Sequence, residues 1–302
     1  MSYREVVVGV DGSYAAERAL LWAAAEAQRR RARLLIAHAG DAAEQSDPNS
    51  ASPTPYGQAL LIDASASVFD AGIDCEVRTV LRDEPAVRLL TELGAKADLV
   101  VVGSHGLAAV PGALLGSVAY RVVAHSGAPV AVVGEHNSDR AAALELPITV
   151  GLTTSRAGQT ALEFAFAEAA LRGVGLRAVH SWAEVDWSNA ASALLYSTGE
   201  EFFARQEQLV REVLAPLRAK YPQVAVSVSR TAESVERSLV QASARSSLLV
   251  LGSRHGSRRL LSRLGPTGSR LVHVARCPVV LVGKQLAPER SSRAPLSRTN
   301  AG

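Results

Sequence analysis

The sequence predicts two tandem α/β domains, each a doubly wound, Rossmann-like parallel sheet of five strands flanked by helices. Three observations predict this architecture. The chain of 302 residues is long enough for about two ordinary domains. It contains an internal repeat with a period of about 145 residues, which is far longer than a solenoid repeat. Each copy alternates short, β-branched runs with longer helical patterns, as α/β folds do.

The repeat is visible at both ends of each copy. The opening VVVGVDGS of residues 6–13 returns as ITVGLTTS at residues 148–155, an offset of 142. Near the end of each copy, APVAVV at 128–133 returns as CPVVLV at 277–282, an offset of 149. The second copy therefore gains seven residues, which we assign to the segment between Ala183 and Gly199.

The strands of the first copy are expected where apolar residues run almost without interruption, because strands buried on both faces of a parallel sheet have this pattern. Ser13 is placed to cap the first helix. Asp83 is placed to cap a later helix that would start at Glu84-Pro85, with Pro85 at the tolerated first position. The expected strands are Glu5–Val10, Arg33–Ala39, Asp74–Val80, Leu99–Gly103 and Pro129–Val133.

Composition changes mark the expected domain boundaries. We expect a first domain at residues 1–136, a polar linker at 137–146 and a second domain at 147–286. The tail at 287–302 is rich in Ser, Arg and Pro and shows no periodicity, so we expect it to be disordered.

Charge and cysteine content argue against several classes of protein. The formal net charge is only +3 and no basic stripe is evident, which argues against nucleic-acid binding. Cys75 and Cys277 lie far apart and indicate neither a disulfide framework nor a zinc site. No apolar run is long enough to span a membrane, and residues 1–5 do not resemble a signal peptide. We therefore expect a cytoplasmic protein.

Glycines after the fourth expected strand predict a phosphate-binding loop. Gly103 is followed by Gly106 after two residues, and Gly116-Ser117 follows after nine more, at the start of a helical pattern. Glycine lets the backbone approach a phosphate closely, and free N–H groups at a helix N-terminus attract anions. Asp11 ends the first expected strand and would lie beside this loop if strands one and four are neighbours. Asp11 is placed either to bind a ribose or adenine edge or to cap the following turn.

The loop matches neither of the common nucleotide fingerprints, since the chain contains no GxxxxGK[ST] and no G-x-G-x-x-G that opens the first helix. The GxxG, nine residues, GS pattern after an apolar strand resembles the ATP-binding universal stress protein family, as does the opening VVVGVDGS. That resemblance implies a five-stranded parallel sheet, usually dimerised through its last strand. It also implies an adenosine and phosphate site formed by Gly9, Asp11, Ala39, Val102, Gly103, Gly106, Gly116, Ser117 and Val118.

The second copy departs from the pattern, and we expect it to bind nucleotide weakly or not at all. Thr153 stands where the first copy has Asp11, and Pro266 stands in place of Ser117, which removes one N–H donor. A weak second site is left open. It would use Gly252, Gly265, Gly268 and Ser269, with help from Arg254, Arg258, Arg259 and Arg263.

The sequence favours a nucleotide-dependent regulatory or stress-response module. ATP is the expected ligand, any Mg²⁺ would come with the nucleotide, and no catalytic residues are predicted. Two alternatives remain: a slow ATPase that uses the same site, and an interaction scaffold without ligand. As partners, we expect the adenine nucleotide and either a second copy of the chain or pairing of the two halves through their last strands.

Overall fold

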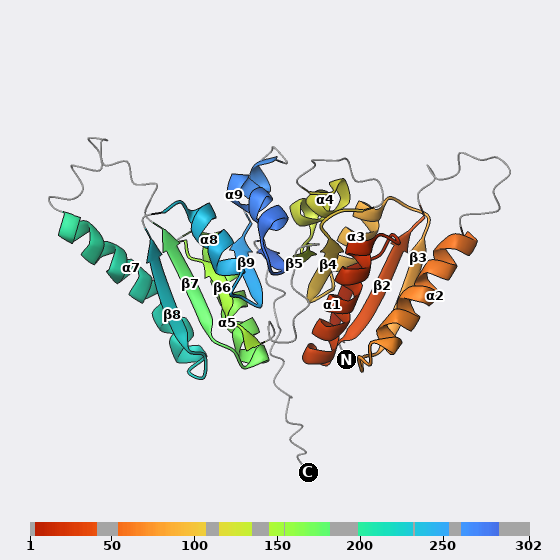
Figure 1. Ribbon diagram of the computed structural model, residues 1–302, viewed down its shortest axis with the longest axis horizontal. Helices are drawn as coiled ribbons and strands as arrows, with labels where there is room; N and C mark the ends of the chain where they lie inside the picture. The colour runs from red at the N-terminus through yellow and green to blue at the C-terminus, as the bar shows by residue number, and fades with distance from the viewer. Residues whose placement is uncertain are drawn as a thin grey trace, which may run out of the picture.

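The computed structural model describes residues 4–40, 54–106, 115–134, 145–153, 155–181, 199–231, 233–253 and 261–283. The strands of these residues form one continuous sheet in the order β3-β2-β1-β4-β5-β10-β9-β6-β7-β8 (Figure 1). Each half contributes five strands that run parallel to one another. The expected fold class is therefore confirmed for both halves.

The strands of the first half are β1 (Glu5–Gly9), β2 (Arg33–Ala39), β3 (Val77–Arg82), β4 (Leu99–Gly103) and β5 (Val130–Val133). The expected strand Asp74–Val80 is wrong at both ends. Among the described strands β3 lies at the edge of the sheet and pairs with β2 alone, from the pair Leu34–Val77 to the pair Ala39–Arg82, and this pairing sets its extent.

The helices of the first half are α1 (Tyr14–Arg30), α2 (Thr54–Asp70), α3 (Ala86–Gly94) and α4 (Ser117–His125). The predicted cap of α1 is confirmed, since the Ser13 hydroxyl accepts a hydrogen bond from the Ala16 amide at 3.2 Å. The predicted cap of α3 is wrong. Pro85 is the residue that precedes the helix, and its extended backbone (ψ 131°) makes α3 begin at Ala86, without a side-chain cap.

The second half repeats this order. Its strands are β6 (Ile148–Gly151), β7 (Leu176–Ser181), β8 (Val226–Thr231), β9 (Leu248–Gly252) and β10 (Val279–Val282). Its helices are α5 (Arg156–Arg172), α7 (Gly199–Lys220), α8 (Val235–Ser243) and α9 (Leu261–Val274). The expected insertion between Ala183 and Gly199 and the expected linker and tail lie almost entirely outside the described residues.

The two halves join through their last strands. β10 pairs antiparallel with β5, and Val280 lies opposite Ala131. This is one of the two arrangements that the sequence left open. Side chains on the two faces of the sheet form two buried clusters, one covered by α1, α2, α5 and α7 and the other by α3, α4, α8 and α9.

Four charged side chains link α1 to α5 across the junction of the halves. Glu26 pairs with Arg30 within α1, and Glu168 pairs with Arg172 within α5. The pairs also cross: Arg30 contacts Glu168 at 2.5 Å, and Arg172 contacts Glu26 at 2.7 Å. All four side chains are buried. Each residue of α1 has its counterpart in α5 142 residues later, so this ionic quartet has the same approximate two-fold symmetry as the sheet.

Candidate functional site

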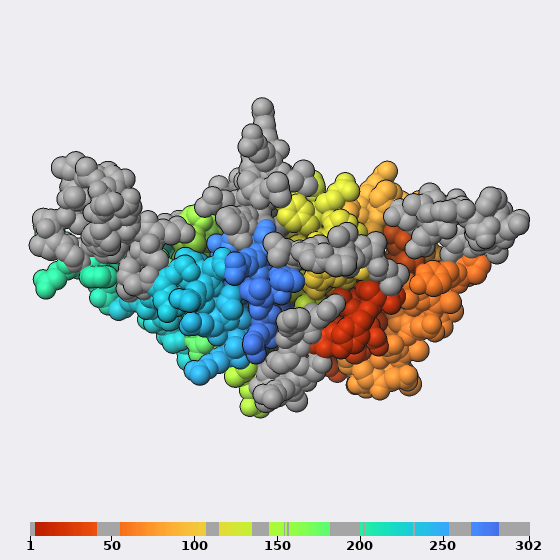
Figure 2. Space-filling model, turned by 45° about the horizontal axis from the view of Figure 1, so that its top comes forward, coloured from red at the N-terminus to blue at the C-terminus, as the bar shows by residue number. Residues whose placement is uncertain are grey.

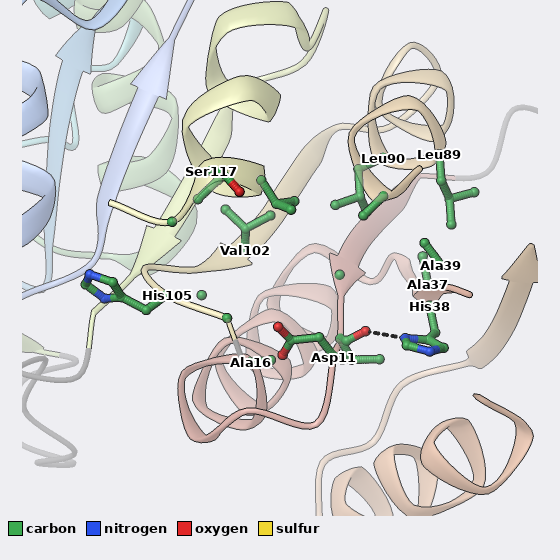
Figure 3. A pocket seen from close by; sticks show the side chains of 18 residues that line it. Asp11, Ala16, Ala37, His38, Ala39, Leu89, Leu90, Val102, His105 and Ser117 are labelled. Atoms are coloured by element: carbon green, nitrogen blue, oxygen red, sulfur yellow. Dashed lines mark hydrogen bonds between the residues drawn. The ribbon is translucent and has the colours of Figure 1, made fainter. Parts of the chain in front are cut away.

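A cavity of about 260 Å³ opens at the carboxyl ends of β1, β2 and β4 in the first half (Figure 3). Strand order reverses here, because β1 lies between β2 and β4, and α1 and α4, the helices that follow β1 and β4, cover opposite faces of the sheet. Ligands of open α/β sheets bind at such a switch point. All nine residues that the resemblance implies line this one cavity: Gly9, Asp11, Ala39, Val102, Gly103, Gly106, Gly116, Ser117 and Val118.

One side of the cavity is apolar. Ala37 and Ala39 come from the end of β2, while Ala86, Leu89 and Leu90 come from the first turns of α3. Leu89 and Leu90 lie above the two alanines in the close-up view (Figure 3). The sequence analysis missed the three α3 residues. The apolar face of that helix was a signal, but which strand it covers depends on tertiary packing.

The Asp11 carboxylate holds the turn between β1 and α1. Its Oδ1 accepts hydrogen bonds from the Ser13 amide at 3.0 Å and from the Ser13 hydroxyl at 2.6 Å. The capping role that the sequence left open is thus present. Asp11 also lines the cavity, so one side chain stabilises the turn and presents a carboxylate to the cavity.

The loop after β4 is packed tightly against its neighbours. A side chain at Gly103 would place Cβ 2.8 Å from the Ala15 carbonyl carbon, so only glycine lets β4 pass this close to the start of α1. A Cβ at Gly106 would collide with Asp11 Oδ2. These contacts bring the loop and the carboxylate side by side, as the sequence analysis expected if strands one and four were neighbours.

The N-terminus of α4 closes the opposite side of the cavity. Gly116 precedes the helix and Ser117 is its first residue. The expectation that the Gly116 N–H is free is wrong, because it donates to the Ser104 carbonyl at 2.8 Å. The amides of Ser117, Val118 and Ala119 lie in the first turn of the helix, where no intrahelical acceptor exists, and they carry the positive end of its dipole.

Two histidines also line the cavity. His38 is buried and its Nδ1 lies 2.8 Å from the Val10 carbonyl, which ties β2 to the turn after β1. His105, in the loop after β4, is half-buried. Its ring lies 6.0 Å from that of His273 in α9, so the loop of the first half contacts a helix of the second.

The second half does not repeat this backbone arrangement. Helix α9 begins at Leu261, so Gly265, Pro266, Gly268 and Ser269 all lie within the helix and not before its first turn. Amides inside a helix donate to the preceding turn. Gly252 ends β9, as Gly103 ends β4, but it has no helix N-terminus at Gly265 to face. The side chains of Arg254, Arg258, Arg259 and Arg263 lie outside the described residues.

The family model for the universal stress protein family matches residues 2–134 and again residues 146–283. The chain belongs to the universal stress protein family. A universal stress protein of Mycobacterium tuberculosis is 33% identical over 294 residues, which cover 91% of this chain and 96% of that protein.

Solved universal stress proteins share the fold. The crystal structure of one from Archaeoglobus fulgidus covers 92% of this universal stress protein and 96% of its own chain, with a TM-score of 0.66 and 17% identity. A universal stress protein solved in complex with cAMP is 35% identical over 44% of this chain and 98% of its own, with a TM-score of 0.34.

The described residues contain no group of three or more His, Cys, Asp or Glu side chains that could hold a metal ion. None of their helices is both long and apolar enough to cross a bilayer.

Proposed function

We propose that the first domain binds an adenine nucleotide and that its occupancy regulates the protein. The adenine base would lie between the alanines of β2 and the leucines of α3, and the phosphate would lie at the N-terminus of α4. The observation that carries this proposal is that one cavity combines an apolar slot, a carboxylate and a helix N-terminus. Such a slot accepts a base, and the helix N-terminus favours an anion.

A regulatory role is supported by where the loop lies. His105 lines the cavity and also packs against His273, and α4 contacts α9. Figure 2 shows α9 (blue) at the junction of the two halves. A ligand that rearranges the loop would therefore alter contacts between the domains. The resemblance predicts ATP as this ligand, accompanied by any Mg²⁺ that its phosphates carry.

Isothermal titration calorimetry of the full chain with ATP, ADP and AMP tests the proposal. Gly116→Glu would place a carboxylate at the N-terminus of α4, and we expect it to abolish binding in the first domain. Gly265→Glu is the matched control, because Gly265 stands at the position in the second half that corresponds to Gly116. Binding that is the same in wild type and Gly116→Glu, with both folded by circular dichroism, would refute the site.

The two alternatives give different results in the same preparations. A slow ATPase would release phosphate at ~1 s⁻¹ or faster, the lower end of ordinary turnover, and Gly116→Glu would stop it. A scaffold without ligand would bind none of the three nucleotides and would carry none through purification.

A further inference from the structure

Helix α2, at one outer end of the molecule (Figure 1), has an exposed apolar face. Its inner side joins the buried cluster beneath α1 and α2. On its outer side Ile62 is 68% exposed and Phe69 is 82% exposed. Together with the exposed Ala59 and Ala66 they follow one another at intervals of three, four and three residues, which places all four on one side of the helix. We call these four residues the α2 stripe. A helix that is apolar on both sides is ordinarily buried on both sides.

The fold itself does not require this stripe. Helix α7 takes the equivalent place at the other outer end of the molecule (Figure 1), 149 residues later, as Val77 of β3 and Val226 of β8 show. At this offset Ile62 and Phe69 correspond to Arg211 and Arg218, which are both exposed. Since the same helix position accepts arginine in one half, packing within the domain does not account for large apolar side chains in the other.

The order of side-chain sizes along the stripe fits a second copy of itself. Two α2 helices that run antiparallel about a two-fold axis at the level of residue 64 bring Phe69 level with Ala59 of the partner subunit. The same axis brings Ile62 level with Ala66 of the partner subunit. Each layer then joins one large and one small side chain, which is how antiparallel helices fill the space between them. A parallel pair would set Phe69 against its own copy and leave gaps at the alanines.

The remaining surfaces also direct a second copy to α2. The resemblance implies dimers that form through the last strand, but β5 and β10 are already paired with each other within one chain. A contact between two chains must therefore use another surface. The exposed part of the α2 stripe is on the order of 300–400 Å², a size of patch that often serves an interaction. Two copies would bury about 700 Å², below the ~1,200 Å² of a stable interface, so the contact would be weak.

We propose that α2 is the interface of a weak two-fold homodimer of the whole chain, in which two copies of the α2 stripe pack antiparallel. This dimer is independent of the nucleotide proposed for the first domain. It leaves the junction of the halves unchanged and adds a contact at the outer end of the first half.

One charged residue beside the stripe should limit the strength of the dimer. Asp63 lies one residue from the level of the axis, so its carboxylate and the copy in the partner subunit would be offset by only about 3 Å along the helices. In an antiparallel pair a flank of one helix faces the same flank of the other, so these two carboxylates repel. Asp70 lies on the same flank, but it would be offset from its own copy by about 18 Å.

Sedimentation velocity of the full chain over a range of concentrations tests the dimer. We expect a monomer at low concentration and an increasing fraction of dimer at high concentration. Phe69→Arg, which introduces the residue that α7 carries at this position, should weaken the dimer at least about tenfold. The matched control is Tyr14→Arg, which replaces another exposed aromatic residue (62% exposed) and should leave the association unchanged. A wild-type chain that stays monomeric, or equal effects of the two variants with both folded by circular dichroism, would overturn the proposal.

The antiparallel arrangement has a test of its own. Asp63→Asn removes the repulsion beside the axis and should tighten the dimer about two- to threefold. Asp70→Asn removes the same charge from the same flank and should leave the affinity unchanged. Both variants raise the formal net charge of +3 by one, so a general effect of charge would be equal in the two. No tightening by Asp63→Asn, or the same tightening by both, would overturn the antiparallel pairing.

Discussion

Removing the charge of Glu26 should destabilise the protein strongly. Its side chain is only 1% exposed and faces Arg29, Arg30 and Arg172. Glu26→Gln keeps the shape but leaves Arg30 and Arg172 to share Glu168, at 2.5 and 3.4 Å. Removing one partner of a buried ion pair costs about 3–5 kcal/mol, because a buried charge is left uncompensated. For a chain of 302 residues the melting temperature should fall by about 5–8 °C.

Acid should act on the same carboxylate. Burial by itself would raise the pKa of Glu26, but the guanidinium groups of Arg172, Arg30 and Arg29 outweigh it and lower the pKa below its ordinary 4.5. A carboxyl whose pKa is lowered by folding contributes stability above its unfolded pKa, and that contribution is lost as the pH falls through the folded value. The wild-type protein should therefore lose stability below about pH 4.5, and Glu26→Gln should lose less.

Differential scanning calorimetry and urea unfolding at pH 7 and pH 4 measure both effects. The control is the quadruple variant in which Glu26, Arg30, Glu168 and Arg172 all become Met. Replacing a whole buried ionic cluster by apolar residues of similar volume is often neutral or stabilising. A melting temperature for Glu26→Gln within 2 °C of wild type at pH 7 would refute the reasoning.

Three further predictions concern the first domain and the cysteines. Gly103→Ala should lower the free energy of unfolding in urea by about 1–3 kcal/mol, because the new Cβ would lie 2.8 Å from the backbone at the start of α1. Gly9→Ala should lower it by less, because the new Cβ would meet only the end of the Leu90 side chain, which can move. Ser13→Ala should cost about 1 kcal/mol through loss of the α1 cap, and no change in the urea midpoint would contradict this. Burial raises the pKa of Cys277 to about 12, so in the folded protein iodoacetamide should modify the half-buried Cys75 first, as read by mass spectrometry. Earlier modification of Cys277 would contradict that burial.

Local patterns predicted the central strands and the glycine loop well. β2 and β4 have the predicted bounds, since their apolar runs are buried on both faces and end at clear breaks. The cap by Ser13 and the closeness of Asp11 to Gly106 also follow from turns at strand ends.

Features that depend on a partner elsewhere in the chain were missed. β3 is an edge strand whose bounds are set by β2. Leu89 and Leu90 reach the cavity only because α3 packs over β1 and β2. The Gly116 N–H is not free, because it donates to the Ser104 carbonyl at the other end of the loop. Helix α9 starts several residues before the glycine that marks the corresponding start in the first domain. Residue types and spacing cannot reveal such dependence.

The antiparallel contact between β5 and β10 makes each molecule the covalent equivalent of an asymmetric dimer. Two separate chains paired in this way would part on dilution, whereas tethered halves meet at an effective concentration in the millimolar range. The stoichiometry of one glycine-loop domain to one arginine-loop domain is thus set by the polypeptide itself. Neither half needs to recognise its own copy, so a substitution in one of them leaves the other unchanged. Such freedom accounts for how the two loops come to differ in charge, with four arginines in the second and none in the first.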